Sequence, residues 1–106
     1  MREVAFLRWL TDTCRIRHAH WQLKGRVVRF VVQLELSLEG QWHAVRRYDT
    51  AHGLSHCDLL HPDGRTDKVP LAFRDYNEAL TFAETDLRTH WAVYIRRYAE
   101  EAVRHD

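Results

Sequence analysis

Residues 28–38 read Val28-Arg29-Phe30-Val31-Val32-Gln33-Leu34-Glu35-Leu36-Ser37-Leu38, with an apolar side chain at every even-numbered position. All but one of the odd-numbered positions are polar. Because successive side chains of a β-strand point to opposite faces, this alternation predicts a strand with one buried face. Glu39-Gly40 follows and predicts a hairpin turn, since glycine adopts positive φ at little cost. The strand and its turn together indicate an antiparallel sheet.

Further strands are predicted before and after this hairpin. Residues 14–25 alternate polar His18, His20 and Gln22 with apolar neighbours, and Lys24-Gly25 predicts a turn. Three shorter strands are predicted at 42–48, 54–60 and 65–69. Turn signals separate them, above all His61-Pro62-Asp63-Gly64, and Pro70 ends the last one.

Helices are predicted at both ends of the chain. Residues 3–13 place apolar side chains on one stripe at helical spacing and predict a short helix. A long helix of about 29 residues is predicted after Asp75, an N-cap residue with Glu78 three positions on. At 1.5 Å per residue it measures roughly 43 Å, so it either overhangs the sheet or packs on a second copy.

The fold class expected from these elements is α+β, in a single domain spanning residues 1–106. An antiparallel meander of three to five strands packs one face against the long C-terminal helix, with a short N-terminal helix beside it. The apolar side chains expected to meet come from one strand and one helix: Val28, Phe30, Val32, Leu34 and Leu36 against Leu80, Ala83, Leu87 and Trp91.

Composition excludes several classes of protein. No apolar run reaches the roughly 20 residues that cross a bilayer, and Met1-Arg2-Glu3 does not begin a signal peptide. Two cysteines, Cys14 and Cys57, are too few for a disulfide framework and lack the spacing of a zinc site. We therefore expect a cytoplasmic protein without a membrane partner, a cofactor or a bound metal.

Positive charge is concentrated near the N-terminus, although the net charge is only +1. Between Asp12 and Glu35 there is no acidic residue, and a tryptophan interrupts a basic run. Arginines can follow phosphates while a base stacks on an indole, which predicts RNA binding. The candidate RNA-binding residues are Arg15, Arg17, Trp21, Lys24, Arg26 and Arg46. The alternative is a solvated strand edge that charge protects from aggregation.

The segment Arg46–Asp58 is the candidate catalytic region, because ionisable side chains surround a bend between two predicted strands. A turn at 50–53 places Arg47 opposite His56 in the simplest register. His52 and His56 could then act as acid and base on a phosphodiester, with Asp49 orienting one ring and Arg47 stabilising charge. RNA supplies its own nucleophile, so this chemistry predicts a metal-independent ribonuclease.

Three other interpretations of the same segment remain open. Arg47 and Asp49 can form a structural ion pair while His52 caps the bend. The segment can also contact RNA or another ligand without catalysis. A metal held by His52, His56 and Asp58 is disfavoured, because residues 52 and 56 of an extended strand lie about 13 Å apart.

Five stretches resemble a family of short prokaryotic proteins known only as a domain of unknown function. They are Val31–Glu35, Arg47–Gly53, His56 with Asp58, His61–Gly64, and Tyr76–Thr81. The resemblance runs from Arg26 onward, about three quarters of the chain, and implies no activity.

The layout of an Arg-aromatic-Asp strand, a bend, histidines and a helix is also similar to TumE-like toxins of toxin–antitoxin pairs. That resemblance implies a growth-inhibiting protein that acts on RNA and is silenced by an antitoxin-like partner. The contrasting expectation is a non-enzymatic interaction protein that forms a homo-oligomer through its long helix, near Trp91, Tyr94 and Tyr98, and uses its basic N-terminal arm.

Overall fold

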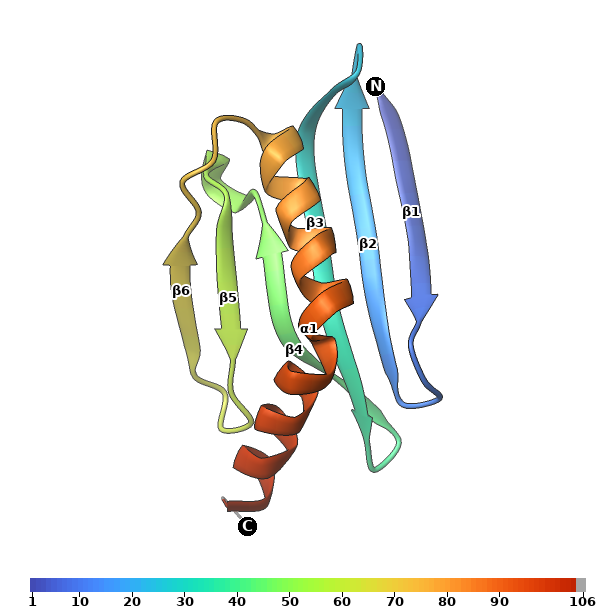
Figure 1. Cartoon of the computed structure of the whole chain (residues 1–106), viewed down its shortest axis with the longest axis vertical. Helices are drawn as coiled ribbons and strands as arrows, with labels where there is room; N and C mark the ends of the chain where they lie inside the picture. Colours follow the sequence, from blue (N-terminus) through green and yellow to red (C-terminus); the bar gives the residue numbers. More distant parts are fainter. Residues whose placement is uncertain (105–106) are drawn as a thin grey trace.

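A six-stranded antiparallel sheet and one long helix make up the protein, and the computed structural model describes residues 1–104 (Figure 1). Each strand pairs with the next along the chain, so the sheet is a simple meander. The strands are β1 (Arg2–Trp9), β2 (Cys14–Leu23), β3 (Arg26–Leu38), β4 (Gln41–Asp49), β5 (His56–Leu60) and β6 (Thr66–Pro70). The α+β class is confirmed, but the sheet has six strands where three to five were predicted.

The predicted N-terminal helix over residues 3–13 is wrong, because this segment forms strand β1. Eight residues of β1 pair in register with β2, from Arg2 opposite Gln22 to Trp9 opposite Arg15. The Phe6 ring stacks on His18 with 4.4 Å between ring centroids. Isolated short helices are marginal in water, whereas the edge of β2 offers backbone hydrogen bonds to the whole segment. Pairing with the sheet therefore overrides the helical spacing.

The core lies between one face of the sheet and helix α1 (Tyr76–Arg104), which crosses β3 and β4 (Figure 1). Phe30, Val32 and Leu34 of β3 are fully buried, as are Ala83 and Leu87 of the helix. Leu80 belongs to the same cluster and Trp91 packs against it, so most of the predicted sheet–helix pairing is confirmed.

Val28 is an exception, since it is 42% exposed and lies outside this core. The β2–β3 register shifts after Trp21 opposite Arg29, and Gln22 then lies opposite Val27. Val28 is the extra residue of this bulge. A bulge reverses the alternation beyond it, and Val27 packs on the core in place of Val28.

The long helix begins at the predicted cap. The backbone amide of Glu78 donates to Asp75 Oδ1 at 2.9 Å, and Glu78 Oε2 accepts from the amide of Arg74 at 3.1 Å. The first bond satisfies a donor that the first helical turn leaves unpaired, and the second satisfies a donor in the segment that leads into the helix. None of the described helices is long and apolar enough to span a membrane.

Candidate functional site on the uncovered sheet face

The face of the sheet that points away from α1, here called the uncovered face, carries a row of polar side chains across five strands. The row runs through directly paired positions of β2 to β6: Arg17, Gln33, Arg47, Asp58 and Lys68. Since Val32 and Leu34 point into the core, the alternation of β3 turns Gln33 and its row to the opposite side. Antiparallel pairing therefore gathers residues that lie far apart in the sequence.

Hydrogen bonds connect this row to Glu35. Arg47 Nε donates to Gln33 Oε1 at 2.7 Å, and Gln33 Nε2 donates to Glu35 Oε2 at 2.6 Å. Glu35 also receives bonds from Arg15 at 2.6 Å and Arg17 at 3.2 Å. Burial alone would raise the pKa of Glu35, but these three donors outweigh it and lower that pKa. Glu35 is therefore a charged anchor that fixes the neighbouring guanidinium groups.

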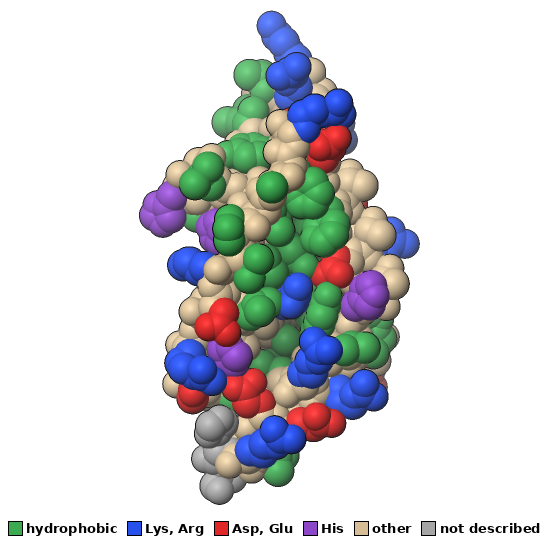
Figure 2. Space-filling model, turned by 60° about the vertical axis from the view of Figure 1, so that its left-hand side comes forward, with side chains coloured by type: hydrophobic (Ala, Val, Ile, Leu, Met, Phe, Trp, Pro, Cys, Tyr) green, Lys and Arg blue, Asp and Glu red, His purple; other side chains and the backbone are tan. Residues whose placement is uncertain are grey.

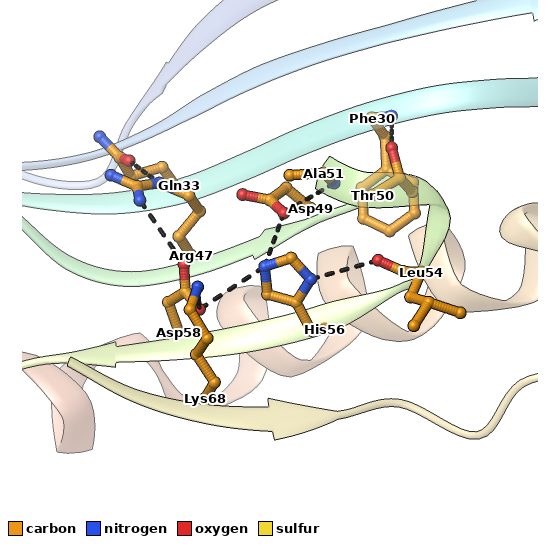
Figure 3. Close-up of polar contacts among 10 residues, drawn as sticks. All are labelled: Phe30, Gln33, Arg47, Asp49, Thr50, Ala51, Leu54, His56, Asp58 and Lys68. Atoms are coloured by element: carbon orange, nitrogen blue, oxygen red, sulfur yellow. Dashed lines mark hydrogen bonds and ion pairs between the residues drawn. The ribbon is translucent and has the colours of Figure 1, made fainter.

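Asp49, His56 and Asp58 form a cluster on the same face (Figure 3). Asp49 lies opposite His56 in the β4–β5 pair, and Asp49 Oδ1 is 2.9 Å from His56 Nε2. Asp58 Oδ1 is 3.6 Å from the same nitrogen, while His56 Nδ1 lies 3.2 Å from the carbonyl oxygen of Leu54. The ligand atoms of the three side chains all lie within 4.8 Å of one another, close enough to hold a metal ion.

Two basic side chains flank the cluster. Arg47 Nη1 is 3.6 Å from Asp58 Oδ2, and Lys68 Nζ is 3.2 Å from Asp58 Oδ1. The Asp58 side chain is only 5% exposed, whereas that of Lys68 is 67% exposed. Asp58 is thus buried beneath cations that themselves reach solvent.

The β4–β5 register corrects the one predicted from sequence. Arg47 lies opposite Asp58, and not opposite His56 as predicted. The connection after Asp49 contains Thr50, the 3-10 turn η1 (Ala51–Gly53) and two further residues before β5 begins at His56. The observed register differs from the predicted one by two residues. A shift of two residues keeps every side chain on the same face of the sheet, so the four predicted residues still share one side: Arg47, Asp49, His56 and Asp58.

His52 is separate from this cluster. It lies in η1 with a positive φ of 64° and is exposed. Within residues 1–104, no hydrogen bond, ion pair or ring contact joins His52 to another side chain. Both ring nitrogens of His56 face partners inside the chain. The two imidazoles are thus not paired with each other, and their catalytic role stays a prediction.

Five of the six predicted RNA-binding residues lie on the uncovered face or at the β2–β3 turn, but Arg46 does not. Arg15, Arg17 and Trp21 occupy the uncovered face, and Lys24 and Arg26 are exposed at the β2–β3 turn. Arg46 lies on the helix side of the sheet, with Nε 3.0 Å from Tyr48 Oη and 3.7 Å from Asp86 Oδ2. Its guanidinium lies 4.1 Å from the Tyr94 ring centroid, so the sheet–helix interface holds it.

Aromatic side chains missed by the sequence analysis complete the uncovered face. The Arg15 guanidinium lies 3.7 Å from the ring centroid of Trp42 and 5.5 Å from that of Trp9. The two indoles meet edge to face at 5.6 Å, and Trp9 remains 56% exposed. Trp9 fell within the helix predicted over residues 3–13, and Trp42 began the strand predicted over residues 42–48. Because β1 is a strand, Trp9 lies opposite Arg15.

The helix aromatics lie in the core and its margin. Tyr98 is buried, and Trp91 and Tyr94 pack against the core cluster. Exposed apolar side chains gather instead beside the N-terminal part of the helix, where Phe73 and Phe82 lie 5.1 Å apart, and Figure 2 shows a hydrophobic band on this side of the molecule. Oligomerisation through the helix stays a prediction.

Comparison with known proteins gives a family and no function. No curated protein and no solved structure matches the chain. None of the comparisons shows the likeness to TumE-like toxins, which also stays a prediction. The model of a domain of unknown function, DUF7718, matches residues 1–104, more of the chain than the five resembling stretches. The chain belongs to the DUF7718 family.

Proposed function

We propose that the protein is an RNA-directed module that binds single-stranded RNA across its uncovered sheet face. The observation that carries this proposal is the group formed by Arg15, Trp9 and Trp42, in which one guanidinium contacts two solvent-accessible indoles that also contact each other. Unpaired bases stack on exposed aromatic rings whatever their sequence, and arginines beside the rings bind the backbone.

Further cations on this face support the proposal. The Arg17 side chain is 52% exposed and that of Lys68 is 67% exposed, so both can reach phosphates. Arg29 lies over the Trp21 ring at 3.9 Å, a second pairing of guanidinium and indole on the same face. Guanidinium groups bind phosphate oxygens in a forked geometry that favours backbone contacts.

A binding titration tests the proposal. Fluorescence anisotropy with a labelled single-stranded RNA should show saturable binding, which Trp9→Ala weakens at least about fivefold, since stacking contributes roughly 1–3 kcal/mol per base. Arg17→Ala should also weaken binding, whereas Arg88→Ala, an exposed arginine of the helix, is the matched control and should not. Failure to bind, or equal binding of an RNA duplex, would contradict the proposal.

A second candidate function is association with another protein, favoured by the exposed apolar side chains of Phe73 and Phe82. Aromatic groups of this kind are enriched at protein interfaces. Light scattering on the purified chain tests this candidate: a dimer that Phe82→Ser converts to monomer supports it. A monomer that copurifies with no partner counts against it.

A further inference from the structure

His56 presents a single ring nitrogen to two carboxylates. Nε2 faces Oδ1 of both Asp49 and Asp58, at 2.9 and 3.6 Å. Its other nitrogen, Nδ1, lies 3.2 Å from the carbonyl oxygen of Leu54, an acceptor that requires a hydrogen on Nδ1. In the neutral ring, this leaves a lone pair on Nε2, directed at two negatively charged oxygens (Figure 3). One proton on Nε2 would satisfy Asp49 and leave Asp58 beyond hydrogen-bond distance.

A second histidine in the chain shows the contrasting arrangement. His61 also contacts two carboxylates, but Nε2 faces Asp67 and Nδ1 faces Glu101, each at 2.8 Å. A protonated ring satisfies both of these acceptors, one on each side. The two acids at His61 lie on opposite ring edges and do not converge on one point. His56 differs because its acids converge on one nitrogen.

The distances from His56 Nε2 to the two carboxylate oxygens fit a shared cation. A four-coordinate ion with bonds of about 2.0–2.1 Å to nitrogen and oxygen separates its ligand atoms by roughly 3.3 Å. The observed distances of 2.9 and 3.6 Å lie on either side of this value. A backbone carbonyl that accepts from the remote nitrogen is also the usual partner of a histidine that ligates a metal.

We propose that Asp49, His56 and Asp58 bind one divalent first-row transition-metal ion, such as Zn²⁺ or Mn²⁺. One imidazole and two carboxylates form a mixed nitrogen and oxygen set, which suits these ions better than Ca²⁺, an ion that takes six to eight oxygens. His56 Nε2 and one oxygen of each aspartate are the ligand atoms. The side chains of Asp49 and His56 are 11% and 13% exposed, so the site is accessible from the uncovered face.

Lys68 competes with the ion in this arrangement. Its ammonium lies 3.2 Å from Asp58 Oδ1, the oxygen that also faces His56. Its side chain is 67% exposed and can move into solvent when an ion takes its place. Removal of this charge by Lys68→Ala should therefore tighten metal binding, a response that binding elsewhere on the protein would not give.

Calorimetric titration of the chelator-treated full chain with Zn²⁺ alone, and then with Mn²⁺ alone, tests the proposal. We expect one ion per chain. Asp49→Asn, His56→Gln and Asp58→Asn should each weaken binding by at least the roughly 10- to 100-fold that loss of an outer-shell partner costs. His61→Gln is the matched control, because it removes an imidazole that also contacts two acids, and it should leave binding unchanged.

A measurement on the wild-type chain covers the case in which a variant fails to fold. Two-dimensional ¹⁵N NMR of the histidine rings should show Nε2 of His56 shifting on addition of Zn²⁺, with the His61 signals in place. Absence of saturable binding, equal binding by folded His56→Gln, or unmoved His56 signals would overturn the proposal.

Three protein ligands leave at least one coordination position for an outside group, as in catalytic zinc centres. Beside Arg47, that position would take a phosphate oxygen of bound RNA, and this step alone rests on the proposed RNA-binding function. The metal-site proposal and the RNA-binding proposal can fail separately. Metal titration without RNA tests the ion site, and RNA binding by the metal-free chain tests the RNA-binding surface.

Discussion

Tyr48 of β4 donates a hydrogen bond to Asp86 of α1 and so ties the sheet to the helix from within the core. The Tyr48 side chain is 1% exposed, and Asp86 also accepts a hydrogen bond from Tyr94 at 2.9 Å. Burial, and then the bond to Asp86, raise the pKa of Tyr48 well above its usual value, so its hydroxyl remains a donor. The contact holds the helix on one face of the sheet and leaves the other face uncovered.

Tyr48→Phe should destabilise the protein by about 1.5–3 kcal/mol, because it removes a buried hydrogen bond to a charged acceptor. Urea unfolding followed by circular dichroism measures this loss. Tyr76→Phe is the matched control, since its hydroxyl donates to the neutral carbonyl of Gly53 at 2.6 Å. A Tyr48→Phe cost no larger than that of the control would contradict the role given to Asp86.

His18 should make stability fall as the pH is lowered. Burial, and then the positive charges of His20 and Arg8, lower its pKa from 6.5 to about 4. The unfolded chain therefore takes up a proton near pH 6.5 that the folded chain takes up only near pH 4. The contribution of His18 to stability is constant above this window and declines through it by up to about 3 kcal/mol, at 1.36 kcal/mol per pKa unit.

The free energy of unfolding at pH 7 and at pH 5 tests this effect. His18→Gln should show a smaller difference between the two values than wild type. His61→Gln provides a control of opposite sign, because hydrogen bonds to Asp67 and Glu101 raise the pKa of His61. The stabilisation from His61 is complete below pH 6.5 and is lost as the pH rises through its folded pKa. An unchanged difference for His18→Gln would contradict the assignment.

RNA affinity should depend on salt through the arginines of the uncovered face. For single strands, the logarithm of the binding constant falls with the logarithm of salt concentration by about 0.7 per phosphate contact. Arg17→Ala should reduce this slope by about that amount, and Arg88→Ala should leave it unchanged. Titrations at several salt concentrations measure both, and identical slopes for Arg17→Ala and wild type would exclude a phosphate contact at Arg17.

Expression in growing cells tests the ribonuclease and toxin hypothesis. If the protein cleaves RNA with His52 and His56, wild type should slow growth, and His52→Ala and His56→Ala should each relieve the effect. His56 contacts two aspartates, whereas His52 makes no hydrogen bond, ion pair or ring contact with a described side chain, so relief by His56→Ala alone would assign the effect to the cluster. Equal growth for all three would remove the catalytic hypothesis.

Local patterns predicted the middle and the end of the chain well. The alternation of residues 28–38 predicted β3, and Asp75 with Glu78 marked the start of the helix. The N-terminal strand was missed, because its apolar side chains fit a helical stripe as well as a strand and only the edge of β2 decides between them. Bulges have no clear sequence signal either, which explains the misplacement of Val28.

The sequence predicted which residues form the candidate site, but it did not predict which of them lie opposite each other in the β4–β5 pair. Arg47, Asp49, His56 and Asp58 share one face as expected, since a register shift of two residues conserves it. The length of the connection around η1 determines which of them are neighbours, and sequence does not specify that length. Contacts with Gln33 and Lys68 come from the neighbouring strands β3 and β6, and the register of those strands is not specified by the sequence either.

Backbone amide NMR of the ¹⁵N-labelled chain, titrated with a short single-stranded RNA, tests most directly whether the uncovered face is the functional surface. We predict shifts concentrated at the uncovered-face positions of β1 to β4, including Trp9, Arg15, Arg17 and Trp42, and at their indole and guanidinium groups. The exposed helix positions Arg88 and Arg96 should not move. Shifts confined to the helix, or absent at a large excess of RNA, would contradict the account.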